Sequence, residues 1–174
     1  MQHERLGRTH SVDQTIQDVI DKYLFARHEL LVLGRAHPTR IGGNDNIIGR
    51  IGEFIGLRFL ESLGQHPLKI LHKSNCGFDL IEGELRTQVK VITEENQRGC
   101  TVRLTEPWNQ LLLIELGAHY KPIRIGLLTK DQHKLALGEN RSWSHKPIVK
   151  RTMLGPKGLI ARYGRVYRRE ELQF

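Results

Sequence analysis

Residues 77–92 read GFDLIEGELRTQVKVI and are the most informative part of the chain. A short apolar segment comes first, an acidic residue and a glycine then mark a turn, and the second half alternates between apolar and polar residues. Side chains two residues apart on a strand share a face. Gln88 and Lys90 are therefore expected to point to one side, and Val89 and Val91 into the core.

The predicted hairpin returns its second strand beside Asp79, so the side chains of Asp79, Gln88 and Lys90 are expected to meet at one place. Upstream, residues 47–63 have the apolar periodicity of a helix and contain three glycines within two turns. Each glycine costs about 1 kcal/mol in a helix interior relative to alanine. Another element must therefore approach that face closely, and Glu53 in this stretch is expected to be the fourth member of the cluster.

This arrangement resembles the PD-(D/E)XK nuclease superfamily, whose members share the restriction-endonuclease-like fold. The family pattern is a helix bearing Glu, a strand ending at Asp, a turn, and a strand carrying (D/E)-x-K. Glu53 stands at the helix position, Asp79 at the first Asp, and Gln88-Val89-Lys90 at the last element. The resemblance covers about residues 47–92 and continues more weakly to about residue 137. It departs from the family at Gln88, an amide in place of a carboxylate.

The resemblance implies a DNA endonuclease, of the type II restriction kind or a related defence or repair nuclease, that depends on Mg²⁺, for which Mn²⁺ can substitute. Asp79 would be the central metal ligand, with the Gln88 amide oxygen and the Val89 carbonyl completing the protein side. Glu53 would bind a second metal or hold a metal-bound water, and Lys90 would orient or deprotonate the attacking water. Because Gln88 lowers the negative charge of the site, a catalytically decayed DNA-binding module or subunit on the same fold stays open as the alternative.

The rest of the chain favours one α/β domain over residues 1–174, with a mixed central sheet flanked by helices. A helix is expected at 11–34, where it is either a dimer surface or a core element. The catalytic core is expected at 45–137, followed by a basic segment at 140–174 with a short helix near 148–154. Further strands are expected at 68–72, 101–104, 111–116, 123–129 and 133–137.

The formal net charge is +8, and residues 140–174 contain nine basic and two acidic residues. Such a basic segment points to a polyanion, so double-stranded DNA is the expected partner. Duplex cleavage by this class usually needs two active sites, which predicts a homodimer or a heterodimer with a recognition subunit. The expected DNA contacts are Arg50, Lys146, Lys150, Arg151, Lys157, Arg162 and Arg165.

The chain contains two cysteines, and its nine histidines include no pair with H-x₃-H spacing, which argues against a disulfide scaffold and a zinc site. No apolar run approaches the roughly 20 residues that span a bilayer, and the first residues lack the apolar stretch of a secretory signal. A cytoplasmic location without membrane association is therefore expected.

Overall fold

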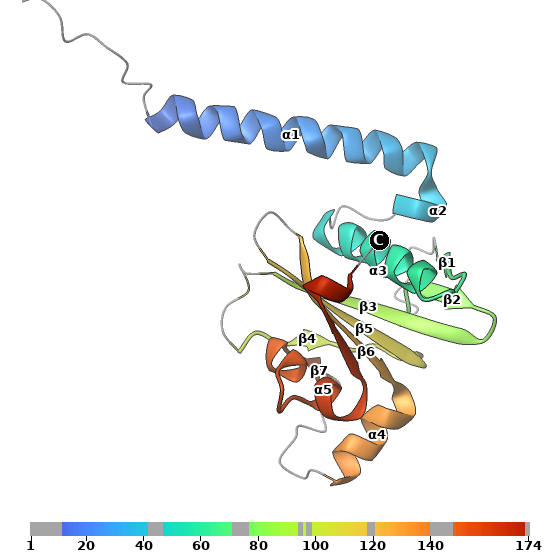
Figure 1. The fold of residues 1–174 in the computed structure, drawn as a ribbon. Coiled ribbons are helices and arrows are strands. Elements are labelled where there is room, and N and C mark those ends of the chain that lie inside the picture. The colour runs from blue at the N-terminus through green and yellow to red at the C-terminus, as the bar shows by residue number, and fades with distance from the viewer. Residues whose placement is uncertain are drawn as a thin grey trace, which may run out of the picture.

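The computed structural model describes residues 12–41, 47–70, 77–93, 96, 99–117, 121–139 and 148–172 (Figure 1). The elements, with 3₁₀ turns labelled η, are α1 (Val12–Ala36), α2 (Pro38–Ile41), α3 (Ile47–Ser62), β1 (Leu68–Lys69), β2 (Leu80–Glu82), β3 (Leu85–Thr93), β4 (Val102–Arg103), β5 (Gln110–Leu116), β6 (Pro122–Thr129), α4 (Lys130–Glu139), β7 (Ile148–Val149), η2 (Arg151–Leu154), α5 (Leu159–Tyr163), β8 (Arg165–Arg168) and η3 (Arg169–Glu171). None of the helices in these ranges is long and apolar enough to cross a membrane.

A six-stranded sheet in the order β1-β2-β3-β5-β6-β8 forms the centre of the molecule. β3 and β5 run parallel, and every other neighbouring pair is antiparallel. β5 is buried along its whole length, as the apolar run at residues 111–114 predicts for a strand covered on both faces. The expected fold class, a mixed sheet flanked by helices in one domain, is confirmed.

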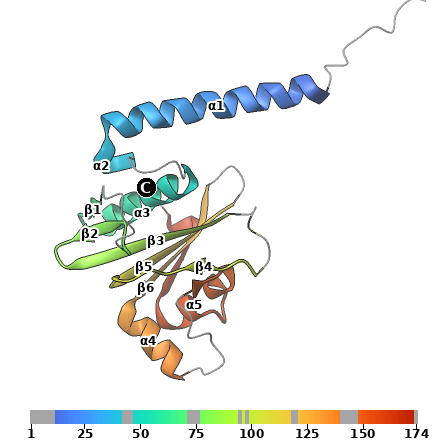
Figure 2. The same ribbon diagram turned by 180° about the vertical axis from the view of Figure 1, so that it is seen from behind.

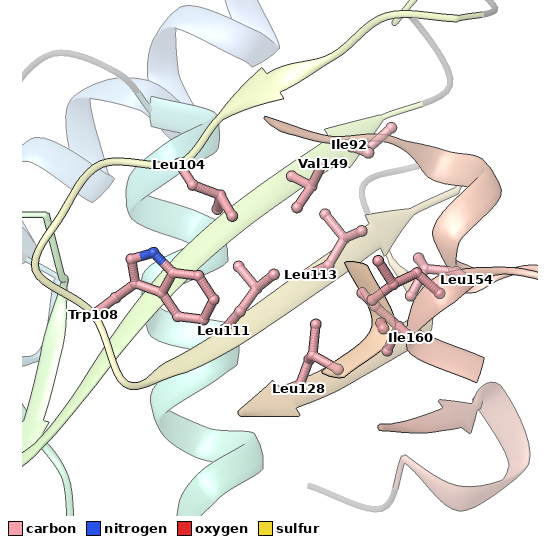
Figure 3. Packing of buried hydrophobic residues seen from close by; sticks show 11 residues of the cluster. Ile92, Leu104, Trp108, Leu111, Leu113, Leu128, Val149, Leu154 and Ile160 are labelled. Carbon is pink, nitrogen blue, oxygen red and sulfur yellow. The ribbon is translucent and has the colours of Figure 1, made fainter. Parts of the chain in front are cut away.

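The two faces of the sheet have separate hydrophobic cores. α3 covers one face, while α4, α5, η2 and the small β4–β7 sheet cover the other (Figures 1 and 2). Alternate residues of β5 serve the two cores: Leu112 and Ile114 face α3, while Leu111 and Leu113 face α5. The core on the face that α4 and α5 cover is called the second core. Figure 3 shows it, with Trp108 and Ile160 packed around Leu111 and Leu113.

The glycines of α3 let β3 approach the helix closely. A Cβ atom on Gly52 would lie 2.0 Å from Cγ2 of Val91, and one on Gly56 would lie 3.2 Å from Cγ2 of Val89. The expectation that something packs tightly on the glycine face is therefore confirmed, and Val89 and Val91 point into this core as predicted. The same contact sets the position of Glu53 above the sheet.

Two local predictions about strands are wrong. Residues 133–137 lie in α4, because Thr129 and Gln132 form a capping box that starts a helix: Thr129 N donates to Gln132 Oε1 at 2.8 Å, and Gln132 N donates to Thr129 Oγ1 at 3.2 Å. The strand expected at 101–104 does not extend the main sheet, since β4 pairs only with β7.

The basic C-terminal segment is part of the fold. β8 pairs with β6 as the last strand of the sheet, and Leu159 and Ile160 of α5 are buried in the second core. Residues 148–154, expected as a short helix, form β7 and the η2 turn. The segment therefore builds one edge and part of one face of the domain.

Candidate active site

Asp79 lies immediately before β2, and the hairpin holds it at two points. Its backbone N–H donates to the Thr87 carbonyl at 2.9 Å, and its carboxylate Oδ2 accepts a hydrogen bond from the Val89 N–H at 2.7 Å. The carboxylate therefore lies beside β3, next to the start of β2. The predicted hairpin, which brings β3 back beside Asp79, is confirmed.

The electrostatic surroundings of Asp79 raise its pKa from 3.8 to about 6. Burial is the largest cause, because it disfavours the charged form, and the negative charge of Glu53 adds to it. The Val89 N–H and the ammonium groups of Lys90 and Lys69 act in the opposite direction. Asp79 therefore lies within electrostatic reach of one further carboxylate and two lysines.

Glu53 projects from α3 and forms an ion pair with Lys69 of β1. The Lys69 side chain is only 1% exposed. Lys69 of β1 pairs with Leu80 of β2, and Leu80 packs in the core under α3. The Lys69 side chain therefore lies on the face of the sheet that α3 covers. Our sequence reasoning missed Lys69. The available signal was a lone charged residue in the apolar run of residues 67–71, in a strand candidate close to Asp79.

β3 supplies Val89 and Lys90 to the site. In a strand, the N–H and C=O of one residue face the same neighbour. Because the Val89 N–H binds the Asp79 carboxylate, the Val89 carbonyl faces the same side. Lys90 is half-buried, and its side chain lies on the opposite face of β3 from Val89. Asp79 thus interacts with groups on both faces of the sheet.

Gln88 occupies a different environment from the one predicted. Its side chain is buried, and its Nε2 donates to the carbonyls of Gly77 at 2.8 Å and Thr105 at 3.2 Å. Its Oε1 accepts the Thr105 N–H at 3.1 Å. The amide therefore ties β3 to the loops before β2 and after β4, and it is not among the charged groups around Asp79. We consequently leave Gln88 out of the candidate ligands.

Two of the expected DNA contacts are engaged within the fold. Arg50 is 5% exposed, and its Nε and Nη2 donate to the Ile41 carbonyl at 3.0 and 2.6 Å. A Cβ on Gly34 of α1 would lie 2.1 Å from Arg50 Nη2, so this glycine makes room for the guanidinium. Arg151 donates to the Thr93 carbonyl and forms an ion pair at 3.3 Å with the buried Glu115. Both guanidinium groups therefore serve contacts inside the domain.

Four of the expected DNA contacts are exposed or half-buried at the surface, namely Lys150, Lys157, Arg162 and Arg165. Lys146 lies outside the described residues. Arg165 belongs to β8, at the opposite edge of the sheet from β1 and β2. Four strand spacings separate β2 from β8, which corresponds to about 19 Å. The Arg165 end of the basic segment is therefore well separated from Asp79.

The donor set around Asp79 fits a hard divalent cation. Mg²⁺ is typically held by one or two carboxylates together with waters and substrate phosphate oxygens. Asp79, Glu53 and the Val89 carbonyl supply such oxygens, and a desolvated carboxylate beside a second one favours a bound cation. Within the described ranges, no three His, Cys, Asp or Glu side chains form a group that could hold a metal.

Comparison with protein-family models finds no match for this sequence, and comparison with curated proteins finds none either. The functional assignment therefore depends on the charged cluster formed by Glu53, Lys69, Asp79 and Lys90, together with the Val89 backbone.

Proposed function

We propose that this chain is a metal-dependent DNA endonuclease of the PD-(D/E)XK superfamily. The observation that carries the proposal is the position of Asp79, held by the Val89 N–H and interacting with Glu53, Lys69 and Lys90. A carboxylate with a raised pKa beside specific charge partners is a candidate functional group. The α3 helix that carries Glu53 and the β2–β3 hairpin beside Asp79 and Lys90 support the proposal.

In the proposed reaction, Asp79, Glu53 and the Val89 carbonyl would hold Mg²⁺ or Mn²⁺. When bound there, such a cation would supply Lewis-acid chemistry to the scissile phosphate and to a water molecule. Lys90 orients the attacking water and stabilises the negative charge that develops on the phosphate. Lys69 fixes Glu53 through their ion pair and balances part of the negative charge of the two carboxylates.

A second candidate function is a DNA-binding module or subunit that has lost catalysis. Two observations favour it. The position that the family fills with a carboxylate is taken by Gln88, whose amide binds backbone groups. In addition, Glu53 is already paired with a buried lysine, which competes with a cation for its oxygens. This module would share the DNA surface of the nuclease but would not hydrolyse phosphodiesters.

Double-stranded DNA is the proposed substrate because the chain carries a formal net charge of +8 and presents Lys150, Lys157, Arg162 and Arg165 at its surface. Cutting both strands of a duplex usually needs two active sites in this class of enzyme. We therefore propose that the protein acts as a homodimer or together with a recognition subunit.

The test is the conversion of supercoiled plasmid to nicked and linear forms by the purified chain in Mg²⁺ or Mn²⁺. Asp79→Asn should abolish cleavage, whereas Asp131→Asn is the matched control because Asp131 is 95% exposed on α4. Cleavage that survives Asp79→Asn would refute the site. Plasmid binding without cleavage by the unmodified chain would favour the decayed module.

A further inference from the structure

α1 carries an apolar repeat with the spacing of a coiled coil. Apolar residues at alternating intervals of four and three form a seam that faces a partner helix when two helices supercoil. The intervals here are maintained from the first turn of α1 to its last turn. The seam positions are Val12, Ile16, Val19, Tyr23, Ala26, Leu30 and Leu33.

Most of the described part of this seam is open to solvent. Val19, Tyr23, Ala26 and Leu33 are exposed, with Tyr23 at 57%, and Leu30 is half-buried. In both views α1 lies as a separate layer beyond α3, and its N-terminal half extends past the sheet (Figures 1 and 2). The exposed seam positions among the described residues are therefore available to a partner helix.

We propose that α1 pairs with α1 of a second copy of this chain as an antiparallel coiled coil. This proposal is independent of catalysis. A two-fold axis perpendicular to the helices would pass near residue 21 and relate the two seams to each other. Each large seam residue then faces a smaller one of the partner helix: Tyr23 is opposite Val19, and Ile16 is opposite Ala26.

The charges beside the seam fit the same register. In an antiparallel pair, the residues that follow the seam positions Val12, Val19 and Ala26 face one another across the interface. Asp13 of each chain then lies opposite Arg27 of the other, which gives two opposite-charge pairs by symmetry, and Ile20 lies opposite its own copy. This match between the two ends of one helix indicates a second copy as the partner.

A parallel pair fits the sequence less well. It would place Lys22 beside Arg27 of the partner helix on both sides, so that like charges face each other. It would also stack Tyr23 on Tyr23 and Ala26 on Ala26, which pairs large with large and small with small. The antiparallel arrangement has one unfavourable contact, between the two copies of Lys22, which are long and reach solvent.

The seam is tested by sedimentation velocity on the full chain over about 1 to 100 µM, a range that brackets micromolar association. The unmodified protein should dimerise. Tyr23→Asp should weaken the dimer at least about tenfold by placing a charge in the seam. Phe25→Asp is the matched control, since Phe25 is also aromatic and 65% exposed but lies off the seam. Circular dichroism checks that both variants stay folded.

A monomer at every concentration would overturn the proposal, and so would equal weakening by Tyr23→Asp and Phe25→Asp. The orientation is tested by charge exchange. Asp13→Arg and Arg27→Asp should each weaken the dimer by about tenfold, because both pairs become repulsive. The double variant should restore dimerisation, and a double variant weaker than either single one would refute the antiparallel register.

Discussion

Replacing Asp79 by asparagine should stabilise the cation-free protein at neutral pH. The folded state raises the pKa of this carboxyl from 3.8 to about 6, chiefly through burial. At pH 8 the native protein therefore keeps a charge that the unfolded chain accommodates more easily in water. The asparagine amide of the Asp79→Asn variant would retain an oxygen that can accept the Val89 N–H without carrying that charge.

The expected magnitude follows from the pKa difference. A rise from 3.8 to about 6 corresponds to about 3 kcal/mol of unfolding free energy. A native carboxyl with a raised pKa binds more protons than the unfolded one, so the unfolding free energy of the unmodified protein falls as pH rises between about 4 and 6. The advantage of Asp79→Asn should therefore be absent near pH 4 and complete above about pH 7. At pH 8 it corresponds to a melting temperature higher by about 6 to 12 °C.

Urea denaturation in EDTA at several pH values between 4 and 8 measures this difference directly. Asp131→Asn is the control. Its unfolding free energy should differ from that of the unmodified protein by the same amount at every pH, because Asp131 is exposed. A difference between Asp79→Asn and the unmodified protein that does not depend on pH would contradict the buried, perturbed carboxylate. A stability advantage of Asp79→Asn over the unmodified protein that shrinks as pH rises would contradict it as well.

Four further outcomes are expected. Lys90→Met should abolish plasmid cleavage while DNA binding in Ca²⁺ persists, measured by gel shift beside Lys134→Met on α4. Gln88→Glu should destabilise the protein by about 2 to 4 kcal/mol in urea, because it sets a carboxylate against two backbone carbonyls, whereas Gln88→Met should cost less. Gly52→Ala should cost about 1 to 3 kcal/mol because its Cβ meets Val91, whereas Gly138→Ala, which meets nothing within 4 Å, should be neutral or stabilising. Alanine at both Lys150 and Lys157 should lower the log–log salt slope of DNA binding by about 1 to 2, and an unchanged slope would place the DNA elsewhere.

The sheet centre and the hairpin could be predicted from sequence because their signals are local. β5 contains an apolar run at residues 111–114, and β3 alternates with period two beyond a Glu-Gly turn. α3 was equally clear, and its glycines correctly indicated a close neighbour. The start of α4 was missed because its capping box, Thr129 with Gln132, lies across the end of a strand.

The parts of the site that depend on tertiary contacts could not be predicted in the same way. The alternation of β3 placed Gln88 and Lys90 on one face but did not show that the loop around Thr105 would take up the Gln88 amide. Arg50 and Arg151 looked like surface cations until their carbonyl partners were known. Lys69 was missed because its role comes from pairing with α3, which is distant in sequence.

Isothermal titration calorimetry with Mn²⁺ measures whether Asp79 belongs to a cation site, which the proposed chemistry requires. The unmodified chain at pH 8 should bind Mn²⁺, Asp79→Asn should lose that binding, and Asp131→Asn should retain it. No binding by the folded, unmodified chain at millimolar Mn²⁺, or binding that Asp79→Asn leaves unchanged, would contradict the proposed site.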